Sequence, residues 1–220
     1  MAYTTINKHT EFFNTKLFTG TSDATTSVTG VGFQPGFTWI KNRDVGDDHM
    51  LFDSVRGVTK RLFSNSSAAE GTDAQTLTSF DSDGFTTGNS RATGGDAGNG
   101  MVSWNWKASG STASNSNGSI NSTVSANTTA GFSIVSYTGT GANATVGHGL
   151  GAVPKLVITK NRSNANGWGV YHASVGNTKS TPLDDNLAAQ TSSAYWNNTT
   201  PTSSVFTVST GNDVNRSGDN

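Results

Sequence analysis

The sequence predicts an all-β protein of two homologous antiparallel β-sandwich units, and three observations support this fold class. First, the chain contains 28 Ser, 33 Thr, 22 Asn and 26 Gly, together 109 of 220 residues. Ser and Asn compete with helical hydrogen bonds and Gly loses the most entropy on ordering, whereas Thr and aromatic residues suit a pleated sheet. Second, apolar and polar residues alternate over short segments that Gly or Pro bounds. Third, the chain contains an internal repeat.

The internal repeat is clearest in two stretches, Val31–Arg43 (VGFQPGFTWIKNR) and Leu150–Arg162 (LGAVPKLVITKNR). Their prolines and their Lys-Asn-Arg ends align without a gap at an offset of 119 residues. The same offset aligns FNTKLFTGT, which begins at Phe13, with FSIVSYTGT, which begins at Phe132. One half of the chain is therefore predicted to be a diverged copy of the other.

Charge and cysteine content exclude several classes of partner and site. The net charge is −1 and 13% of the residues are charged, so we expect no basic surface for nucleic acid or for an anionic membrane. No run approaches the roughly 20 apolar residues that span a bilayer. The absence of cysteine excludes disulfides and thiolate metal sites. We therefore predict neither a nucleic-acid partner nor membrane insertion.

The first unit is expected at residues 10–108, after a polar lead-in at residues 1–9. Its first strand is predicted at Phe13–Thr21, and another begins after Pro35, where a missing amide does least harm to a strand. Asp83-Gly84, between two phenylalanines, predicts a hairpin. The other expected strands are Phe37–Lys41, His49–Val55, the two arms of the hairpin within Leu77–Gly88, and Met101–Ala108.

The second unit is expected at residues 118–220, after a Ser/Asn/Gly-rich linker at residues 109–117 that is predicted to be a flexible tether. Its strands repeat those of the first unit at Phe132–Thr140, Lys155–Lys160 and Trp168–Val175. The counterpart of Met101–Ala108 should follow Gly218. We therefore expect this unit to lack its final strand within residues 118–220. A longer chain, another segment or another subunit would fill the slot, because open sheet edges are usually covered.

Seven short motifs occur in a fixed order along the chain: Tyr3–Lys8, Phe13–Thr15, Gly30–Pro35, Trp39–Arg43, Asp53–Gly57, Ser79–Phe85 and Ser103–Ala108. With them, the chain resembles domains of tail-fibre and related virion structural proteins of phages that infect marine bacteria and cyanobacteria. The resemblance implies sandwich units of jelly-roll or lectin-like type and a place in the virion, an extracellular particle made in the host cytoplasm. It also implies assembly with further copies, as a trimer, and with other virion proteins. It carries over no catalytic residue.

No pattern of catalytic or metal-ligating residues stands out. The four histidines have no helical partner three or four residues away: His9, His49, His148 and His172. Asp47 and Asp48 beside His49 supply too few oxygens for calcium, so a solvated loop is favoured over a cation site. Asp81 and Asp83 resemble the start of a calcium loop but lack its distal glutamate, which favours the hairpin turn. We predict no metal site and no cofactor.

Paired acids and glycine-rich runs are equally uninformative about catalysis. The run Gly139–Gly151 precedes neither a Lys-Ser/Thr pair nor a helix, so phosphate binding is not predicted. A glycosidase needs a buried acid near a second one, whereas Asp184-Asp185 and Glu70 with Asp73 lie in polar, loop-like stretches. We therefore predict a protein that is not an enzyme. Polysaccharide depolymerisation remains the least favoured alternative.

Aromatic residues are the better candidates for recognition, because sugars stack on exposed Trp and Tyr faces. Trp168, Tyr195 and Trp196 lie in Asn-, Ser- and Gly-rich surroundings and are the candidate glycan or receptor-binding residues. The alternative for these three is a place in the core or between subunits. Trp39, Trp104 and Trp106 lie in alternating strands and are expected in the core.

These observations favour a non-enzymatic virion structural protein, a tail fibre or its virion-proximal segment, that assembles with copies of itself and attaches to a host surface glycan or protein. Many copies would multiply weak contacts through avidity. The principal alternative is a carbohydrate-binding module that holds glycan at aromatic loops. The two Lys-Asn-Arg segments are interpreted as strand ends rather than as ligand-binding groups.

Overall fold

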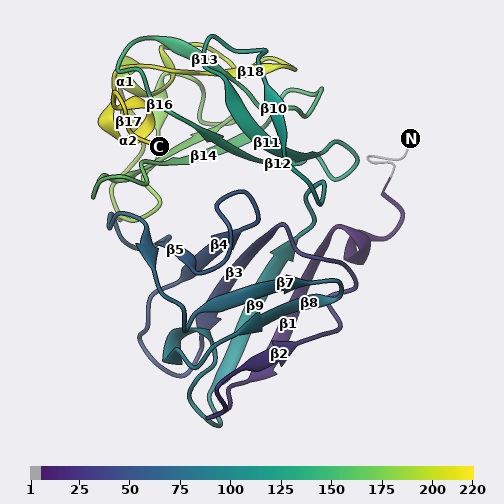
Figure 1. The fold of residues 1–220 in the computed structure, drawn as a ribbon. Helices are drawn as coiled ribbons and strands as arrows, with labels where there is room; N and C mark the ends of the chain where they lie inside the picture. Colours follow the sequence, from purple (N-terminus) through teal and green to yellow (C-terminus); the bar gives the residue numbers. More distant parts are fainter. Residues whose placement is uncertain (1–5) are drawn as a thin grey trace. The chain divides into compact units, whose positions relative to one another are not determined.

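The computed structural model describes residues 6–220, so the first five residues of the predicted lead-in lie outside the described part of the chain. The described residues form an all-β protein, as predicted (Figure 1). Helical structure is limited to short turns: η1 (His9–Glu11), η2 (Arg91–Thr93), α1 (Ser193–Trp196) and α2 (Asn212–Asn215). None of the helices between residues 6 and 220 has the length and apolar character that crossing a membrane requires.

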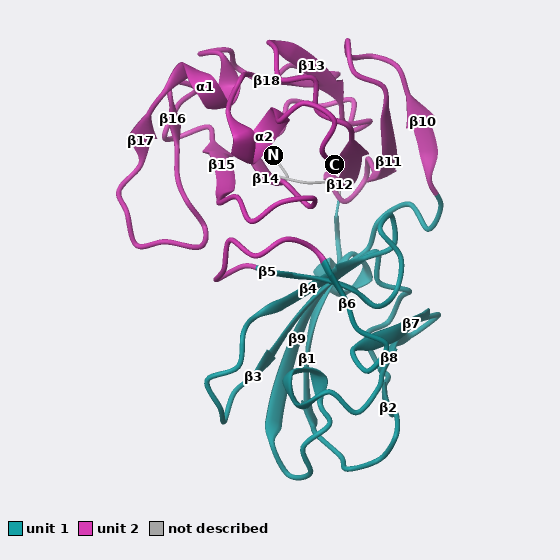
Figure 2. Cartoon of the chain, turned by 60° about the vertical axis from the view of Figure 1, so that its left-hand side comes forward, with its two compact units in different colours: residues 1–63, 71–111 teal, residues 64–70, 112–220 magenta. Residues whose placement is uncertain are grey.

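The chain divides into two compact units (Figure 2). Unit 1 comprises the residues up to Phe63 and Gly71–Ser111, and unit 2 comprises Ser64–Glu70 and Thr112–Asn220. The predicted limits, 10–108 and 118–220, are wrong in one respect, because Ser64–Glu70 belongs to the second unit. The backbone and carboxylate of Glu70 bond to Arg162, which explains this assignment.

Unit 1 is built on a six-stranded antiparallel sheet in the order β1-β9-β3-β4-β5-β6. Strand β9 lies between two others, since Trp104 pairs with Thr15 on one side and with Trp39 on the other. The strands are β1 (Phe13–Thr19), β3 (Phe37–Asn42), β4 (Met50–Asp53), β5 (Lys60–Phe63), β6 (Gly71–Thr72) and β9 (Gly100–Trp106).

A smaller antiparallel sheet, in the order β2-β8-β7, completes unit 1. Its strands are β2 (Thr26–Val28), β7 (Leu77–Asp81) and β8 (Gly84–Thr87), so the predicted hairpin is confirmed. Leu77 and Phe85 of this sheet pack with Ile40, Phe52 and Met101 of the larger sheet in one core. Unit 1 is therefore a sandwich-like pair of sheets around an apolar interior.

Unit 2 contains shorter sheets, in the orders β10-β11-β12, β13-β18, β14-β15 and β16-β17. The strands are β10 (Ala113–Asn115), β11 (Ser122–Asn127), β12 (Phe132–Tyr137), β13 (Ala144–Gly147), β14 (Leu156–Lys160), β15 (Trp168–His172), β16 (Lys179–Ser180), β17 (Gln190–Thr191) and β18 (Val205–Val208). Strand β10 corrects the prediction of a flexible tether at 109–117. Ala113 to Asn115 pair with β11, and this pairing orders the segment.

The core of unit 2 brings residues from several of these sheets together. Val146, Phe206 and Val208 of β13 and β18 pack with Tyr171 of β15 and with Trp196 of α1. Val135 and Tyr137 of β12 and Val157 of β14 border this core. Unit 2 is thus held together by apolar packing across sheets that share few hydrogen bonds.

Strand pairings in the two units correspond at the offset of the sequence repeat. Phe37 pairs with Asp53 in unit 1, and Leu156 pairs with His172 in unit 2, with each residue 119 positions further on. The units differ at β9, for which the described residues of unit 2 supply no counterpart. Strands β12 and β14 are consequently both edge strands, as the sequence repeat predicts.

The loop between β2 and β3 is held by the hairpin turn of β7 and β8. The carboxylate of Asp83 accepts hydrogen bonds from the amides of Gly30 (2.9 Å) and Gly32 (2.6 Å). These two backbone bonds lower the pKa of Asp83 below its usual range. Gly84 follows with a φ of 152°, and a Cβ there would lie 1.9 Å from the carbonyl oxygen of Val28, so this position requires glycine.

Replacing Asp83 by Ala should lower the melting temperature of unit 1 at pH 7. Because the pKa of Asp83 is lower in the folded than in the unfolded chain, its stabilisation is present above the unfolded pKa, about 3.9. It is lost as the pH falls through the lower folded pKa. Calorimetry at pH 7 and at a series of lower pH values should therefore show a gap between the native chain and the variant that narrows in acid. Asp23→Ala, in an exposed turn, is the control, and a gap independent of pH would contradict this role.

Candidate functional site

Two of the three predicted recognition residues are buried, and the expectation that they offer ring faces to a ligand is wrong for both. Trp196 is 2% exposed, lies in the core 6.1 Å from the ring of Tyr171, and donates from Nε1 to the carbonyl oxygen of Lys179 (3.1 Å). Trp168 is 6% exposed and donates from Nε1 to the carbonyl oxygen of Ser66 (3.1 Å).

Tyr195 is half-buried on the single-turn helix α1. Its hydroxyl donates to the carboxylate of Asp213 (3.0 Å). Burial, together with this bond and the charge of Asp213, raises the pKa of Tyr195 to about 12. Tyr195 therefore keeps its proton at neutral pH and is committed to a structural hydrogen bond. The structure does not gather these three residues into an exposed aromatic surface.

A different set of aromatic rings lies on one face of the six-stranded sheet of unit 1. We call it the aromatic face and define it by Phe13, Phe37, Trp39, Trp104 and Trp106, all partly exposed. Trp106 lies between two phenylalanines, with ring centroids 4.8 Å from Phe13 and 5.3 Å from Phe37. Trp104 lies 6.0 Å from Trp39, edge to face. Such tilted pairs hold each other in place while leaving part of each ring in contact with solvent.

The opposite face of the same strands is buried and carries several polar side chains beside the apolar core residues. Thr38 donates to the side-chain oxygen of Asn105 (3.1 Å), and the Asn105 amide donates to the Ser103 hydroxyl (3.0 Å) and to the backbone of Asn14 (3.2 Å). Thr38, Ser103 and Asn105 have no exposed surface. The prediction that Trp39, Trp104 and Trp106 lie in the core is therefore wrong, because the small polar residues between them point inward.

The aromatic face is bordered by one histidine and one exposed leucine. Trp39 donates from Nε1 to Nδ1 of His49 (3.0 Å), and partial burial lowers the pKa of His49. Leu17 on β1 is 63% exposed. The aromatic face can thus offer ring surface for stacking.

The signal for the aromatic face was present in the sequence as aromatic residues at alternating positions of two strands, 37 and 39, 104 and 106. Alternation places such residues on one face but leaves open which face is inside. Here the inner face carries Ile40 and Met101, which pack with Leu77 and Phe85 of the smaller sheet, beside the hydrogen-bonded Asn105.

Asp47, considered above as a cation ligand, is bound within the protein. Its carboxylate accepts from the guanidinium of Arg91 at 2.5 to 3.1 Å, which occupies both oxygens. Among residues 6–220, no three His, Asp or Glu side chains lie close enough together to hold a metal ion. The acids considered for catalysis also have structural bonds: Asp184 accepts from the amide of Trp168, Glu70 from Arg162, and Asp73 from Arg61.

The two Lys-Asn-Arg segments end strands, as predicted. β3 ends at Asn42 and β14 ends at Lys160. The ammonium of Lys41 donates to the carbonyl of Val45 (2.8 Å), and that of Lys160 to the carbonyls of Asn161 (2.6 Å) and Asn164 (3.3 Å). Burial lowers the pKa of Lys160 to about 8, although Asp184 and Asp213 act in the opposite direction. Both lysines thus close the turn that follows their strand.

A shallow pocket of about 410 Å³ opens elsewhere on unit 1. It is lined by backbone and by uncharged side chains, among them Gln34, Ser54, Thr78, Ser79 and Phe80. Its volume lies within the range of small-molecule sites. The lining offers hydrogen bonds and one ring but no ionisable group, so it cannot supply acid or base catalysis.

Residues 8–220 match a protein family described as a domain of unknown function, DUF7483. The match covers almost the whole described chain, including both units. Searches of curated proteins and of solved structures found no match to the chain.

Replacing Trp196 by Ala should destabilise unit 2 by about 3–5 kcal/mol, the cost of removing a large buried ring. Trp104→Ala, the matched control from the aromatic face, should cost unit 1 less, because its ring is already partly in water. Hydrogen exchange of each unit, followed in increasing urea, measures both free energies separately. An equal or larger loss for Trp104→Ala would contradict the assignment of inner and outer faces.

Proposed function

We propose that this chain, which belongs to the DUF7483 family, is a non-enzymatic structural and adhesive component of a phage virion, a tail fibre or its virion-proximal segment. In this role it assembles with copies of itself, as a trimer, and with other virion proteins. It also presents a surface to a glycan or protein of the host. The virion resemblance of its motifs and the use that the fold makes of those motifs support the proposal.

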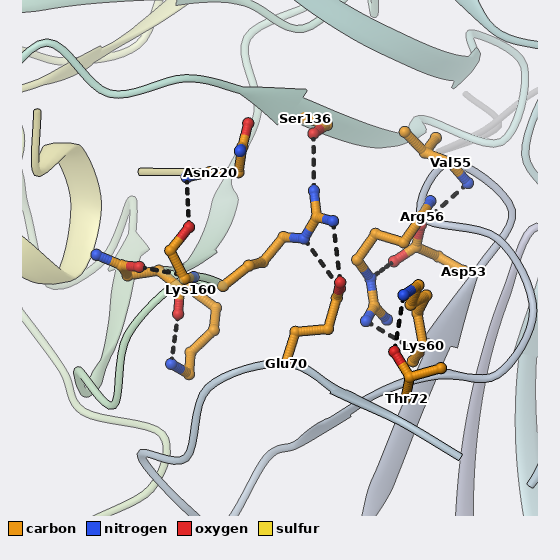
Figure 3. Close-up of polar contacts among 12 residues, drawn as sticks. Asp53, Val55, Arg56, Lys60, Glu70, Thr72, Ser136, Lys160 and Asn220 are labelled. Carbon is orange, nitrogen blue, oxygen red and sulfur yellow. Dashed lines mark hydrogen bonds and ion pairs between the residues drawn. The ribbon is translucent and has the colours of Figure 1, made fainter. Parts of the chain in front are cut away.

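The observation that carries the proposal is that the motif residues build the scaffold. In Asp53–Gly57, the carboxylate of Asp53 accepts from the amides of Val55 (3.0 Å) and Arg56 (2.8 Å), and it pairs with the buried guanidinium of Arg56 (Figure 3). That guanidinium also donates to the carbonyls of Leu51 (2.9 Å) and Lys60 (3.1 Å), which joins β4 to β5. Motif residues whose side chains are bonded within turns suit a rigid structural unit better than a catalytic centre.

The remaining motifs have similar uses. Ser79–Phe85 forms the β7–β8 hairpin, and its Asp83 holds the glycines of Gly30–Pro35. Trp39–Arg43 contains the end of β3, and its Lys41 bonds to the turn that follows. Ser103–Ala108 includes the end of β9. A protein that bears mechanical load benefits from loops fixed in this way, because fixed loops do not open locally.

We further infer that the units arose by internal duplication and are sandwiches of jelly-roll or lectin-like type. Equivalent hydrogen bonds at the 119-residue offset support the duplication. Asn42 accepts from the amide of Asp44 (3.1 Å), and Asn161 accepts from the amide of Ser163 (3.0 Å). Repeated rigid units allow weak surface contacts to be multiplied along a fibre.

The virion role is tested by mass spectrometry of purified particles of a phage that encodes this chain. Its peptides should be present in the particles. The copy number of the chain per particle should be a multiple of three if it forms a trimer. A non-virion enzyme of the same phage serves as the control for carry-over. Detection only in the soluble lysate, at the level of that control, would refute the proposal.

The second candidate function is carbohydrate binding, and the aromatic face is the observation that favours it. Partly exposed Trp39, Trp104 and Trp106 offer apolar ring surface, and the bond from Trp39 to His49 holds one of these rings in place. Recognition of a host polysaccharide on this face is compatible with attachment by a virion protein. It is also compatible with an independent binding module.

Glycan binding is tested with the double variant Trp39→Ala/Trp104→Ala on an array of bacterial surface polysaccharides. Two lost stacking contacts, at about 1 kcal/mol each, should weaken binding of a recognised glycan roughly 30-fold. Val175→Ala, on an exposed side chain of unit 2, is the control and should bind as the native chain does. Unchanged binding by the double variant would exclude the aromatic face as the glycan site.

A further inference from the structure

Unit 2 contains a groove between the edge strands β12 and β14. Val135 to Tyr137 of β12 line one side, and Ile158 to Lys160 of β14 line the other. β12 pairs only with β11, and β14 only with β15, among the strands of residues 6–220. In unit 1 the corresponding strands β1 and β3 both pair with β9, which lies between them.

The chain at Asn220 occupies the position from which β9 starts in unit 1. There, three backbone bonds hold the entry to β9: Gly20 N to Asn99 O (2.8 Å), Gly98 N to Gly20 O (3.0 Å) and Arg43 N to Gly100 O (2.8 Å). Unit 2 repeats all three: Gly139 N to Asp219 O (2.7 Å), Gly218 N to Gly139 O (2.9 Å) and Arg162 N to Asn220 O (2.6 Å). Asn220 therefore corresponds to Gly100, the first residue of β9.

Apolar side chains beside the groove are exposed, unlike their counterparts in unit 1. Leu156 and Ile158 of β14 are 51% and 43% exposed. The corresponding residues of β3, Phe37 and Trp39, are partly shielded by aromatic side chains of β9, with centroid separations of 5.3 Å and 6.0 Å. This difference in exposure arises because β9 lies beside β3, whereas no described strand of unit 2 takes that place beside β14.

We propose that the groove between β12 and β14 is the binding site of one extended strand that continues directly from Asn220, antiparallel to both. The residue after Asn220 takes the place that Met101 has in unit 1, and the strand extends over six residues. It adds main-chain hydrogen bonds along two edges, the mode by which extended segments complete open sheets.

The groove specifies the chemistry of this strand. Its second, fourth and sixth residues share a face with Ile158 and Leu156, where Val102, Trp104 and Trp106 stand in unit 1, so apolar or aromatic side chains are required there. Its first, third and fifth residues face inward. Tyr137 and Asn161 flank the first of these places, and Val135 and Thr159 flank the third, where Met101 and Ser103 stand in unit 1.

The groove is a partly open channel of about 80 Å³, well below the 300 Å³ or more of small-molecule sites, so it does not form a pocket around a small ligand. A strand would instead pair along the edges of β12 and β14. In addition, Arg162 donates to the hydroxyl of Ser136 (3.2 Å) across the groove, while its other nitrogens bind both oxygens of Glu70 (2.9 and 3.1 Å) (Figure 3). This bridge joins the two edges near Asn220, where the strand enters.

The experiment extends the 220-residue chain after Asn220 with the sequence of Met101–Lys107, MVSWNWK. Hydrogen exchange of β12 and β14 is compared with that of the unextended chain, and β3 of unit 1 is the internal reference. The extension should slow exchange in both edge strands at least tenfold and raise the melting temperature of unit 2. Exchange in β3 should not change.

The matched control carries the same residues in the order MVWSWNK, which turns the tryptophans to the inner face. It should give less than a third of the protection of the first extension. Equal protection by both, or none by either, would overturn the proposal. The variant Ile158→Ser provides a second test, which does not depend on how the control extension MVWSWNK behaves. It should leave the unextended chain almost unchanged, because Ile158 is already exposed, and should reduce the protection in the extended chain.

The same heptapeptide added in solution tests whether the strand comes from another molecule. A segment joined to Asn220 has an effective concentration in the millimolar range, so the free peptide should protect β12 and β14 only when its concentration approaches this range. Protection at micromolar peptide would overturn the assignment to a continuous strand in favour of a strand from another chain.

Discussion

The hydrogen bonding of buried asparagine is the constraint on which both units depend. Asn105 has no exposed surface, and its amide and carbonyl groups bond to Asn14, Ser103 and Thr38. Asn215, 2% exposed, donates to the carbonyls of Ala142 and Ser209 and accepts from the amide of Thr140. A buried polar group without partners costs about 1–3 kcal/mol, so each of these side chains requires its neighbours to lie in one arrangement. In a chain with only 32% hydrophobic residues, such bonds define the interior as much as apolar packing does.

The polar residues buried beside this core also account for the aromatic face. A strand has two faces, and in β9 the inner one is occupied by Met101, Ser103 and Asn105. Trp104 and Trp106 then lie on the outer face. There Trp104 packs against Trp39, and Trp106 packs against Phe37. The surface proposed for recognition is therefore a consequence of how the core satisfies its polar groups.

Unit 2 meets the same constraint with a different set of contacts. Asn161 donates to Asn212 and Asp219, and accepts from the amides of Ser163 and Asn164, so the turn after β14 is tied to the last described residues of the chain. The side-chain bonds to Asp219 lower the pKa of this carboxyl group. Together with Arg162, they place Asn220 at the mouth of the groove. The groove is thus a fixed feature of unit 2, with both edges held before any strand binds.

The sequence by itself determined the features that depend on local chemistry. Composition predicted the all-β class, Asp83-Gly84 the hairpin, and Lys-Asn-Arg the ends of two strands, because turn residues act on the backbone beside them. The offset of 119 residues also located β12 and β14 and the position without a second β9. Recognition residues were harder to find, since alternation alone does not say which face of a strand is buried.

Only the tertiary structure decided which side chains are inside and which segments meet. Trp168 and Trp196 are surrounded by polar sequence, yet both are buried and donate hydrogen bonds to Ser66 and Lys179, which lie 102 and 17 residues away. Ser64–Glu70 joins unit 2 through Arg162, a contact that neither segment indicates by itself. Burial and long-range ion pairs depend on atoms that distant parts of the chain supply, and a short window of sequence does not contain those atoms.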